Sequence, residues 1–406
     1  MTAATGAPRM TDRSQSGKWD PETQPRPEGG WSESITTLQG AVVVPPTESK
    51  LVQAAGVLDR EGGYCPQGAL WRKHRAITTR PGMPDGIGET LAGRWLWGGV
   101  LWVHFGHFLV ESTARLWALD RLDRPVDGIL FIPKRPRVGD RVMGYQTRFA
   151  ELMAPGLPLR VAAAPTRVEE LVVPGQGFGL GAITAGTRAF RDAIHNRFAR
   201  DIAPEGPERL YISRSALGLG KGGMLGEERL EDMLEAEGYH IFHPQQHDLP
   251  VQIARYKAAR QVIAADGSAL HLYAMVGRPD QGVAMILRRK SGANNLLADN
   301  VAHFCGCAPL VVEALRTEWV RASRGKSDRL SFGELDHSVI ARRLGEAGFV
   351  RRGLDWPVLS EAEREGILAS RRIAGNDAFI ESPEFARERV RRMRLARRAA
   401  RRQAAG

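Results

Sequence analysis

Short apolar runs alternate with amphipathic segments between residues 208 and 287. The runs have the length of buried strands, and the segments between them carry apolar residues at helical spacing, as at Leu230, Met233 and Leu234. Strands and helices in this order form a parallel sheet with right-handed connections, so the pattern predicts a parallel α/β unit. The expected strands are Glu208–Arg214, Tyr239–Phe242, Val262–Ala265 and Val283–Leu287, and the expected helices are Glu227–Glu237, a helix that Asp248 caps, and Ala269–Val276.

A similar alternation covers residues 94–202, which predicts a first α/β domain at 41–205 and a second at 206–320. Residues 1–40 are rich in polar residues, Gly and Pro, and a disordered arm is expected there. Residues 321–406 are expected to form a helical extension that includes a helix at Phe332–Ala347. The expected strands of the first domain are two strands within Arg94–Phe105 around Gly98-Gly99, then Ile129–Pro133 and Val168–Pro174, and its expected helices are His107–Leu122, Asp140–Met153 and Thr187–Ile202.

The stretch Gln261–Gly277 combines a strand, a tight turn at Asp266-Gly267-Ser268 and a helix. Small residues in such a turn let a ligand approach the backbone, and unpaired N–H groups at the start of the helix attract phosphate. Arg214 ends a neighbouring strand, and ligands of parallel sheets bind at the carboxyl ends of the strands. The pattern indicates a site for a phosphorylated ligand, although a plain strand-to-helix connection would have the same residues.

Polar residues recur along one face of the predicted helix His107–Leu122. His107, Glu111 and Arg115 stand at i, i+4 and i+8, so helical geometry places them in one row. The dipole at the helix start would keep the His107 ring neutral and able to accept a proton. The row is a candidate for general-base chemistry. A solvated helix face, with a histidine that only caps or packs the helix, has the same spacing.

The positive charge of the chain is concentrated at its C-terminal end. The formal net charge is +11, and residues 387–406 hold nine Arg and one Glu, which leaves +3 for the rest. Residues 387–402 alternate Arg with apolar residues at helical spacing, and such a basic helix is drawn to anionic lipid. Nucleic acid binds such tails through charge too, but the rest has no basic excess and no nucleic-acid-binding motif. An anionic membrane surface is therefore the expected partner of residues 387–402, and nucleic acid is not.

Three cysteines, Cys65, Cys305 and Cys307, are too few for a disulfide framework, so a reducing compartment is expected. The pair in Cys305-Gly306-Cys307 has no second cluster that would complete a zinc site. The start of the chain lacks a basic-then-apolar signal pattern, and polar residues interrupt Leu91–Val110 before it reaches the ~20 apolar residues of a membrane span. These features predict a cytoplasmic protein, peripheral at the inner membrane face where the tail binds lipid.

Several sequence blocks resemble glycosyltransferase family 61. The blocks RLYISR, GYHIFHP and ARQVIAADGSALHLYAMV are similar to the C-terminal half of that family, and FGHFLVESTARLWAL resembles its other recurrent block. The resemblance covers roughly residues 95–287. Many members have a His-Gly-Ala-Gly turn where this chain has Asp266-Gly267-Ser268-Ala269, so the role of the first side chain of the turn is not carried over.

The resemblance implies two Rossmann-like domains that face a cleft, in the arrangement called GT-B. It implies an inverting transfer of a sugar, a hexose or a pentose, from a nucleotide-sugar donor to a glycan or lipid-linked acceptor, as in the synthesis of surface polysaccharides. No cofactor and no metal are expected, so protein cations and helix N-termini would stabilise the leaving diphosphate. The candidate donor-binding residues are Arg214, Lys221, Asp266, Gly267, Ser268 and His271, the candidate catalytic residues are His107 and Glu111, and Arg115 is expected on the acceptor side of the cleft.

Two other functions stay open at this point. A protein that binds a nucleotide sugar without transferring it would share these blocks, and the Asp266 difference keeps that alternative in view. A binder of anionic surfaces or nucleic acid that acts only through its Arg-rich tail is the other. Lys221 has a plain alternative as well, since a lysine in a Gly-rich loop is often a mobile surface residue.

Overall fold

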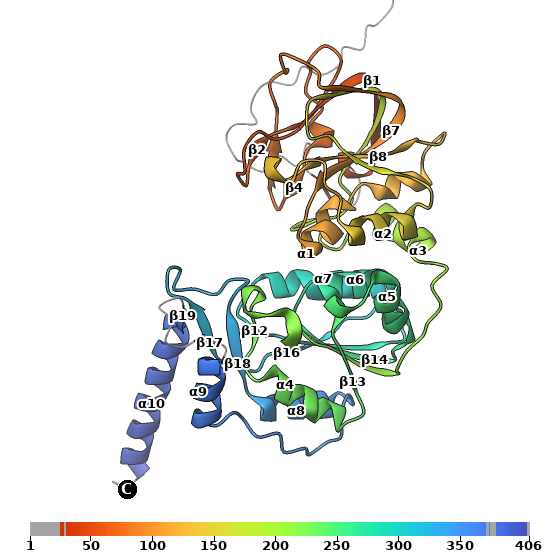
Figure 1. The fold of residues 1–406 in the computed structure, drawn as a ribbon. Helices are drawn as coiled ribbons and strands as arrows, with labels where there is room; N and C mark the ends of the chain where they lie inside the picture. Colours follow the sequence, from red (N-terminus) through yellow and green to blue (C-terminus); the bar gives the residue numbers. More distant parts are fainter. Residues whose placement is uncertain (1–24, 28–29, 371–372, 374–378, 404–406) are drawn as a thin grey trace, which may run out of the picture. The chain divides into compact units, whose positions relative to one another are not determined.

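The computed structural model describes residues 25–27, 30–370, 373 and 379–403 (Figure 1). The chain divides into two compact units, each built from several stretches of sequence. Residues 104–109, 143–156 and 191–205, expected in the first domain, group with the second unit. Of the described residues, the first unit holds those up to 103, 110–142 and 157–190, and the second holds 104–109, 143–156 and those from 191 onward.

The predicted N-terminal arm extends too far along the chain. Residues 1–24 lie outside the described residues, but a short 3-10 helix, η2, spans Gly30–Glu33 and strand β1 begins at Ile35. The second half of β1 is buried because it lies between two other strands of the first unit, β10 and β3. Disorder for residues 35–40 is therefore a wrong prediction.

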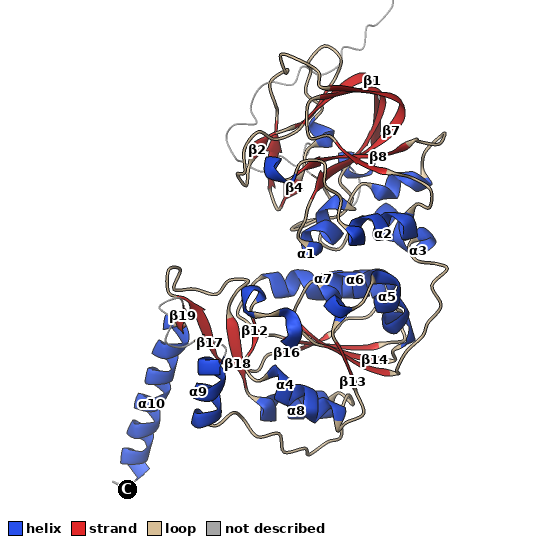
Figure 2. Cartoon of the chain, in the orientation of Figure 1, coloured by secondary structure: helices blue, strands red, loops and turns tan. Residues whose placement is uncertain are grey.

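A mixed six-stranded sheet forms the first unit, in the order β3-β1-β10-β7-β8-β9. Three of its strands, β1, β7 and β8, are labelled in Figure 2. Neighbouring strands from β10 to β9 are parallel, whereas β1 runs antiparallel to both β10 and β3. Buried side chains such as Trp97, Leu130 and Val173 form its core. The strands are β1 Ile35–Val44, β3 Gly56–Leu58, β7 Glu89–Leu101, β8 Gly128–Pro133, β9 Leu159–Val161 and β10 Thr166–Pro174, with the short pairs β2 Gln53–Ala54 with β6 Thr78–Thr79 and β4 Trp71–Arg72 with β5 Arg75–Ala76.

The segment predicted as two strands around Gly98-Gly99 is a single strand, β7. Its pairing with β8 shifts register between Trp97 and Gly99, so the glycines form a bulge and not a turn. Gly99 has a φ of +92°, and a Cβ on Gly98 would lie 2.4 Å from the Phe131 ring. The glycine pair therefore lets the strand continue past a crowded point of the core.

Three short helical segments replace the predicted helix His107–Leu122. They are α1 Phe105–His107, the π-helical η4 Phe108–Ser112 and the 3-10 helix η5 Leu116–Asp120. A regular amphipathic helix is the wrong prediction because residues 108–119 are all buried, so the segment has no solvated face. The Ser112 hydroxyl donates to Val100 O and accepts from Trp102 N, which competes with helical hydrogen bonds.

The second unit contains a five-stranded sheet in the order β13-β11-β14-β15-β16, and all of its neighbouring strands are parallel. This confirms the predicted parallel α/β unit. The strands are β11 Arg209–Ile212, β13 His240–Phe242, β14 Gln261–Ala265, β15 Gly282–Ile286 and β16 Leu310–Val312.

Helices cover both faces of this parallel sheet. In Figure 1 α4 and α8 lie on one face and α5, α6 and α7 on the other. Leu230 and Leu234 of α4 and Ile340 of α8 pack against Tyr211 and Ile263 of the strands. Asp248 caps α5 as predicted, because its side chain accepts a hydrogen bond from Val251 N. The helices that cover this sheet are α4 Glu227–Glu235, α5 Leu249–Ala258, α6 Ala269–Val276, α7 Ala293–Cys305 and α8 His337–Glu346. The chain also contains α2 Gly144–Met153, α3 Arg188–Arg197 and the 3-10 turns η7 Ser215–Leu217 and η8 Leu219–Lys221.

The C-terminal extension contains strands as well as helices, in contrast to the prediction. The stretch Phe332–Ala347 splits because the Asp336 side chain caps α8, and Phe332–Leu335 before it forms a strand. None of the helices in the described part of the chain is long and apolar enough to span a membrane. The remaining elements are β12 Gly223–Met224, β18 Phe332–Leu335, β17 Leu315–Arg321 and β19 Phe379–Glu381, which pair in that order, α9 Glu361–Ser370 and α10 Pro383–Gln403.

Candidate functional site

The parallel sheet of the second unit has a topological switch point between β11 and β14. From β11 the chain passes through α4 to β13 at one edge, and then through α5 to β14 on the other side of β11. Ligands of such sheets bind outside the carboxyl ends of the strands at this point. Arg214 follows β11 and Asp266 follows β14, so the fold brings together the two strand ends that the sequence singles out.

The Arg214 guanidinium group lies over the backbone of Gly267. A Cβ on Gly267 would come within 2.7 Å of Arg214 Nη1, so a glycine permits this approach. Arg214 Nη2 donates to Lys221 O at 3.2 Å, and Nε has no hydrogen-bond partner among the described residues. Burial lowers the pKa of Arg214, but a guanidinium stays protonated near neutral pH. Arg214 therefore presents a charged donor beside the turn.

The turn at Asp266-Gly267-Ser268 leads directly into α6. Its first hydrogen bonds run from Leu270 N to Gly267 O and from His271 N to Ser268 O. The N–H groups of Gly267 and Ser268 have no acceptor within the described ranges. Two backbone donors thus lie at the positive end of a helix, which favours an anion.

A buried carboxylate behind Arg214 escaped the sequence analysis. Glu227 begins α4, is 1% exposed, and accepts hydrogen bonds from Arg214 N at 2.8 Å and from the Tyr211 hydroxyl at 3.0 Å. Burial raises the pKa of Glu227 to about 7, so the group is partly protonated at neutral pH. Glu227 fixes the backbone at the end of β11 and thereby positions Arg214. Its only sequence signal is an acidic residue at a helix start, which is a common pattern in helices of every function.

Two further arginines at this edge of the sheet were also missed. Arg288 and Arg289 follow β15, which pairs with β14, and Arg288 N donates to Asp266 Oδ1 at 3.0 Å. Asp266 is 1% exposed and turns toward these arginines. The signal in the sequence is a basic pair directly after a predicted strand.

Histidines of the segment 104–109 lie near the turn within the second unit. A Cβ on Gly106 would lie 3.0 Å from Ser268 Cβ, and the rings of His104 and His107 have centroids 5.2 Å apart. Because α1 ends at His107, the helix-dipole argument for a neutral His107 ring does not apply. The segment places His107 beside the candidate anion site and in the same unit.

The predicted donor residue His271 lies in the first turn of α6. Burial lowers the pKa of His271 to about 4; the neighbouring His107 also lowers it, and the hydrogen bond with Asn300 opposes this shift. The His271 Nδ1 atom lies 2.9 Å from Asn300 Oδ1 on α7. A neutral His271 ring therefore links α6 to α7 next to the turn.

The other two residues of the predicted row lie in the first unit. The Glu111 carboxylate accepts two hydrogen bonds of 2.8 Å from Arg72, and its side chain is fully buried. Arg115 is 2% exposed and donates to Pro174 O at 2.6 Å and to Ala69 O at 2.7 Å. The predicted row of three side chains is wrong, because the chain between them is not one helix. Arg115 is used to hold two backbone segments together.

Lys221 is the last residue of the 3-10 turn η8, which follows η7. Its backbone carbonyl accepts the hydrogen bond from Arg214, while the residue itself is exposed. The loop therefore contributes to the site at least through its backbone. The lysine side chain stays a candidate for donor binding.

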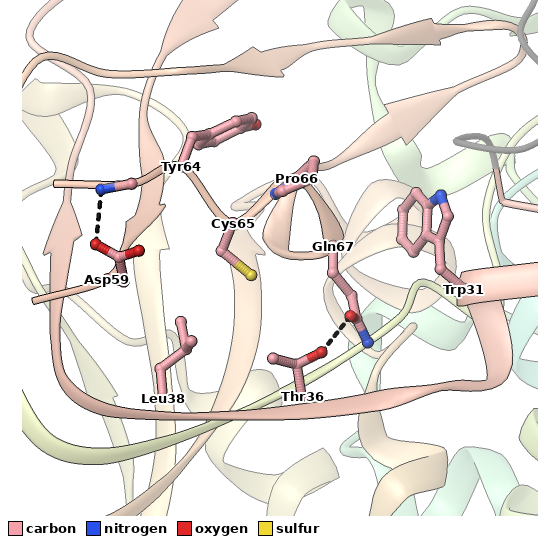
Figure 3. A pocket seen from close by; sticks show the side chains of 9 residues that line it. Trp31, Thr36, Leu38, Asp59, Tyr64, Cys65, Pro66 and Gln67 are labelled. Carbon is pink, nitrogen blue, oxygen red and sulfur yellow. Dashed lines mark hydrogen bonds between the residues drawn. The ribbon is translucent and has the colours of Figure 1, made fainter. Parts of the chain in front are cut away.

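The first unit contains a separate cavity of about 330 Å³ (Figure 3). Its polar groups bond one another, since Thr36 donates to Gln67 Oε1 at 2.6 Å and Gly63 N donates to Asp59 Oδ1 at 2.6 Å. The residues that line the cavity include none of the predicted site residues and no lysine or arginine. Its other lining residues are Trp31, Leu38, Tyr64, Cys65 and Pro66.

Comparison with known proteins bears on what this arrangement does. Residues 105–283 match the family model described as Glycosyltransferase 61, a stretch that runs from α1 to β15 and includes the candidate site up to the start of β15. A search of curated proteins finds no match to the chain. The family match supports a glycosyltransferase function in general terms and agrees with the resemblance found in the sequence. Through residues 105–283 the chain is assigned to glycosyltransferase family 61.

Proposed function

We propose that the protein is an inverting glycosyltransferase that takes a sugar from a nucleotide-sugar donor. The observation that carries the proposal is the convergence of Arg214 with the Gly267 and Ser268 N–H groups at the switch point. A cation and a helix N-terminus together are suited to a diphosphate. The family match supplies the reaction class, and the sugar and nucleotide are open to a ligand panel.

The proposed reaction is a single displacement at the anomeric carbon of the donor sugar. The acceptor oxygen forms a bond to that carbon, and its proton passes to a ring nitrogen of His107. The bond from the carbon to the phosphate oxygen breaks, and its electron pair stays on the leaving diphosphate. The leaving group gains negative charge as this bond breaks, so donors aimed at the phosphate stabilise the transition state. In this proposal the donors are Arg214 and the turn, whose close approach at Gly267 supports the assignment.

The GT-B arrangement, with the two units facing a cleft, is part of the same proposal. The acceptor would be a glycan or a lipid-linked sugar, as in surface polysaccharide synthesis. The proposal assigns phosphate neutralisation to protein cations and requires no divalent ion. A transfer that stops in chelator and returns with manganese would contradict this part.

The donor site is tested with Arg214→Ala. We expect nucleotide-sugar affinity to fall about 10- to 100-fold in calorimetry with chelator present, because a charge-assisted contact of about 1.5–3 kcal/mol is lost. The fold should persist, since Glu227 bonds the backbone of residue 214 and not its side chain. The donor for this titration is the nucleotide sugar that raises the thermal midpoint most in a panel.

Arg260→Ala is the matched control for this experiment. Arg260 precedes β14 at the opposite end of the strand, and its side chain is 75% exposed, so its removal should leave donor affinity unchanged. Equal affinities of wild type and Arg214→Ala would remove Arg214 from the donor site. Equal losses in both variants would show a general charge effect.

The Arg-rich tail is proposed to bind an anionic membrane. Residues 383–403 form α10 as one helix, on which Val390, Met393 and Leu395 are 40%, 45% and 53% exposed. Each arginine near anionic lipid contributes about 1 kcal/mol, and exposed apolar side chains add to the binding.

Truncation after Arg392 should abolish sedimentation with phosphatidylserine vesicles and leave donor affinity intact. This cut keeps the start of α10, where Lys290 pairs with Glu384 and Arg389 pairs with Glu381 at 2.7 Å. A full-length variant with Arg394, Arg397, Arg398, Arg401 and Arg402 changed to Gln separates the effect of charge from that of length. Undiminished sedimentation of both variants would show that the tail is not the anchor.

A further inference from the structure

We propose that Arg288 and Arg289, positioned by Asp266, complete the anion site at the switch point, so that three guanidinium groups bind the leaving diphosphate. This inference rests on the proposed function and adds its phosphate-binding group. It also gives the first side chain of the turn, Asp266, a task in this chain.

The sheet topology places these arginines at the correct edge. β15 pairs in parallel with β14, from Gln261 opposite Gly282 to Ala265 opposite Ile286. Asp266 and Leu287 therefore leave the two strands side by side, and Arg288 and Arg289 follow at once. Arg214 follows β11, and the other two arginines follow β15. These two strands are the neighbours of β14 on its two sides.

Asp266 holds Arg288 by hydrogen bonds and forms a longer ion pair with Arg289. Its Oδ1 atom accepts from Arg288 N at 3.0 Å, and its backbone oxygen accepts from Arg288 Nε at 3.0 Å. Its Oδ2 atom lies 3.6 Å from Arg289 Nε. The Lys290 N–H group donates to Glu318 Oε1 at 2.9 Å, which anchors the end of the same loop. The first side chain of the turn therefore positions cations and is held away from the ligand.

Each of the three guanidinium groups keeps a donor that the described residues do not satisfy. These donors are Arg214 Nε, Arg288 Nη1 and Arg289 Nε; the last lies 3.6 Å from Asp266 Oδ2, an acceptor that also has no hydrogen bond among the described residues. Arg288 is only 3% exposed, and a buried charged donor without an acceptor is costly. Contacts to Asp266 account for Arg288 Nε and not for Nη1, so a structural role alone leaves this group unexplained. A bound oxyanion would satisfy it together with the N–H groups of Gly267 and Ser268.

The charges around the site also favour an anion. Three carboxylates interact with the arginines: Asp266, Glu227 and Glu318. Burial raises the pKa of Glu227 to about 7, so this carboxylate is partly protonated at neutral pH, and burial also raises the pKa of Glu318. Burial lowers the pKa of Arg288 only to about 10, so it stays charged. The three arginines therefore carry slightly more charge than the three carboxylates, so the site keeps a small excess of positive charge.

The test measures binding of inorganic pyrophosphate by calorimetry with chelator present. We compare full-length wild type with Arg289→Gln, Arg288→Lys and the control Arg260→Gln. Arg289→Gln should weaken binding at least tenfold and lessen its dependence on salt, because one cation is removed. Arg288→Lys keeps the charge but loses the fork geometry, and binding should weaken severalfold. Arg260→Gln lies at the other end of β14 and should match wild type.

Asp266→Asn separates positioning from simple charge. If Asp266 positions the arginines, the variant should bind pyrophosphate more weakly, although a negative charge near the anion has been removed. Tighter binding would overturn the positioning role. Wild-type affinity in both Arg289→Gln and Arg288→Lys, or no binding by the wild type, would overturn the three-arginine site.

The two proposals fail in different ways. Pyrophosphate binding that depends on Arg289, in a protein that transfers no sugar from any donor, would keep the anion site and refute the transferase. Sugar transfer and pyrophosphate binding that are both unchanged in Arg289→Gln would keep the transferase and refute this inference.

Discussion

Replacing His107 with alanine is expected to lower the rate of sugar transfer by about 10²–10⁴-fold, the usual cost of a lost general base. The segment 104–109 approaches the turn closely, with Gly106 packed against Ser268 in the second unit. An imidazole there can accept the acceptor proton while the turn holds the leaving group. Donor affinity should change little, because the phosphate contacts come from Arg214 and the backbone. The measurement is kcat under saturating donor, with donor affinity measured separately.

Two histidine variants make this prediction specific. His104→Ala tests the neighbouring ring, whose centroid lies 5.2 Å from that of His107, and His240→Ala is an exposed control at the amino end of β13. A large loss in His104→Ala with a small loss in His107→Ala would identify His104 as the base. Loss of donor binding in His107→Ala would place that ring in the phosphate site.

Glu111 has a different expected effect from the one that its sequence spacing suggests. The sequence places it one helical turn after His107, where it would orient the ring. In the structure it forms a two-bond ion pair with Arg72 inside the first unit, and Arg72 also lies over the Trp102 ring. A change at Glu111 therefore acts first on the packing of that unit.

The second unit could be predicted well because its signals are local. An apolar run that ends at Asp266-Gly267-Ser268 and a helical pattern after it define β14, the turn and α6 without knowledge of distant residues. Asp248 at the start of α5 works in the same way, since the cap is made three residues away at Val251.

The segment after β7 could not be predicted because burial on all sides overrides periodicity. From Phe108 to Leu119 no residue is exposed, so hydrophobic spacing carries no information about a solvent face. Arg115 bonds carbonyls that lie 46 and 59 residues away in the sequence, at Ala69 and Pro174. No pattern within the segment could indicate these partners.

Part of the proposed anion site could be predicted from the sequence. Arg214 and the turn follow predicted strands, and the same argument applied to Val283–Leu287 would have included Arg288 and Arg289. What required the structure is the pairing of β14 with β15, which brings these arginines to Asp266. Glu227 required it too, because its contact with Arg214 N depends on how α4 packs against β11.

Arg115→Met is expected to destabilise the first unit by about 2–6 kcal/mol, the second large effect that we predict. Methionine has a similar length but no donors, so Pro174 O and Ala69 O would each lose a buried hydrogen bond, at about 1–3 kcal/mol per group. The carbonyls belong to the backbone, so no side-chain change can remove them. Gly99 leaves room for this guanidinium, since a Cβ there would lie 3.2 Å from Arg115 Nε. Burial lowers the pKa of Arg115 to about 10, so both bonds are charge-assisted at neutral pH.

The measurement is thermal unfolding of the full chain, with Arg80→Met as a control that removes an exposed arginine from the same unit. The transition that reports on the first unit should move down by several degrees in Arg115→Met and remain in place in Arg80→Met. Saturating donor, which binds the second unit in our proposal, should not restore it, because ligand stabilises only the species that binds it. A variant that unfolds like wild type but raises the KM of the acceptor would return Arg115 to the acceptor site. Such a result would mean that the two carbonyls find other donors, and that the buried arginine is retained for its charge.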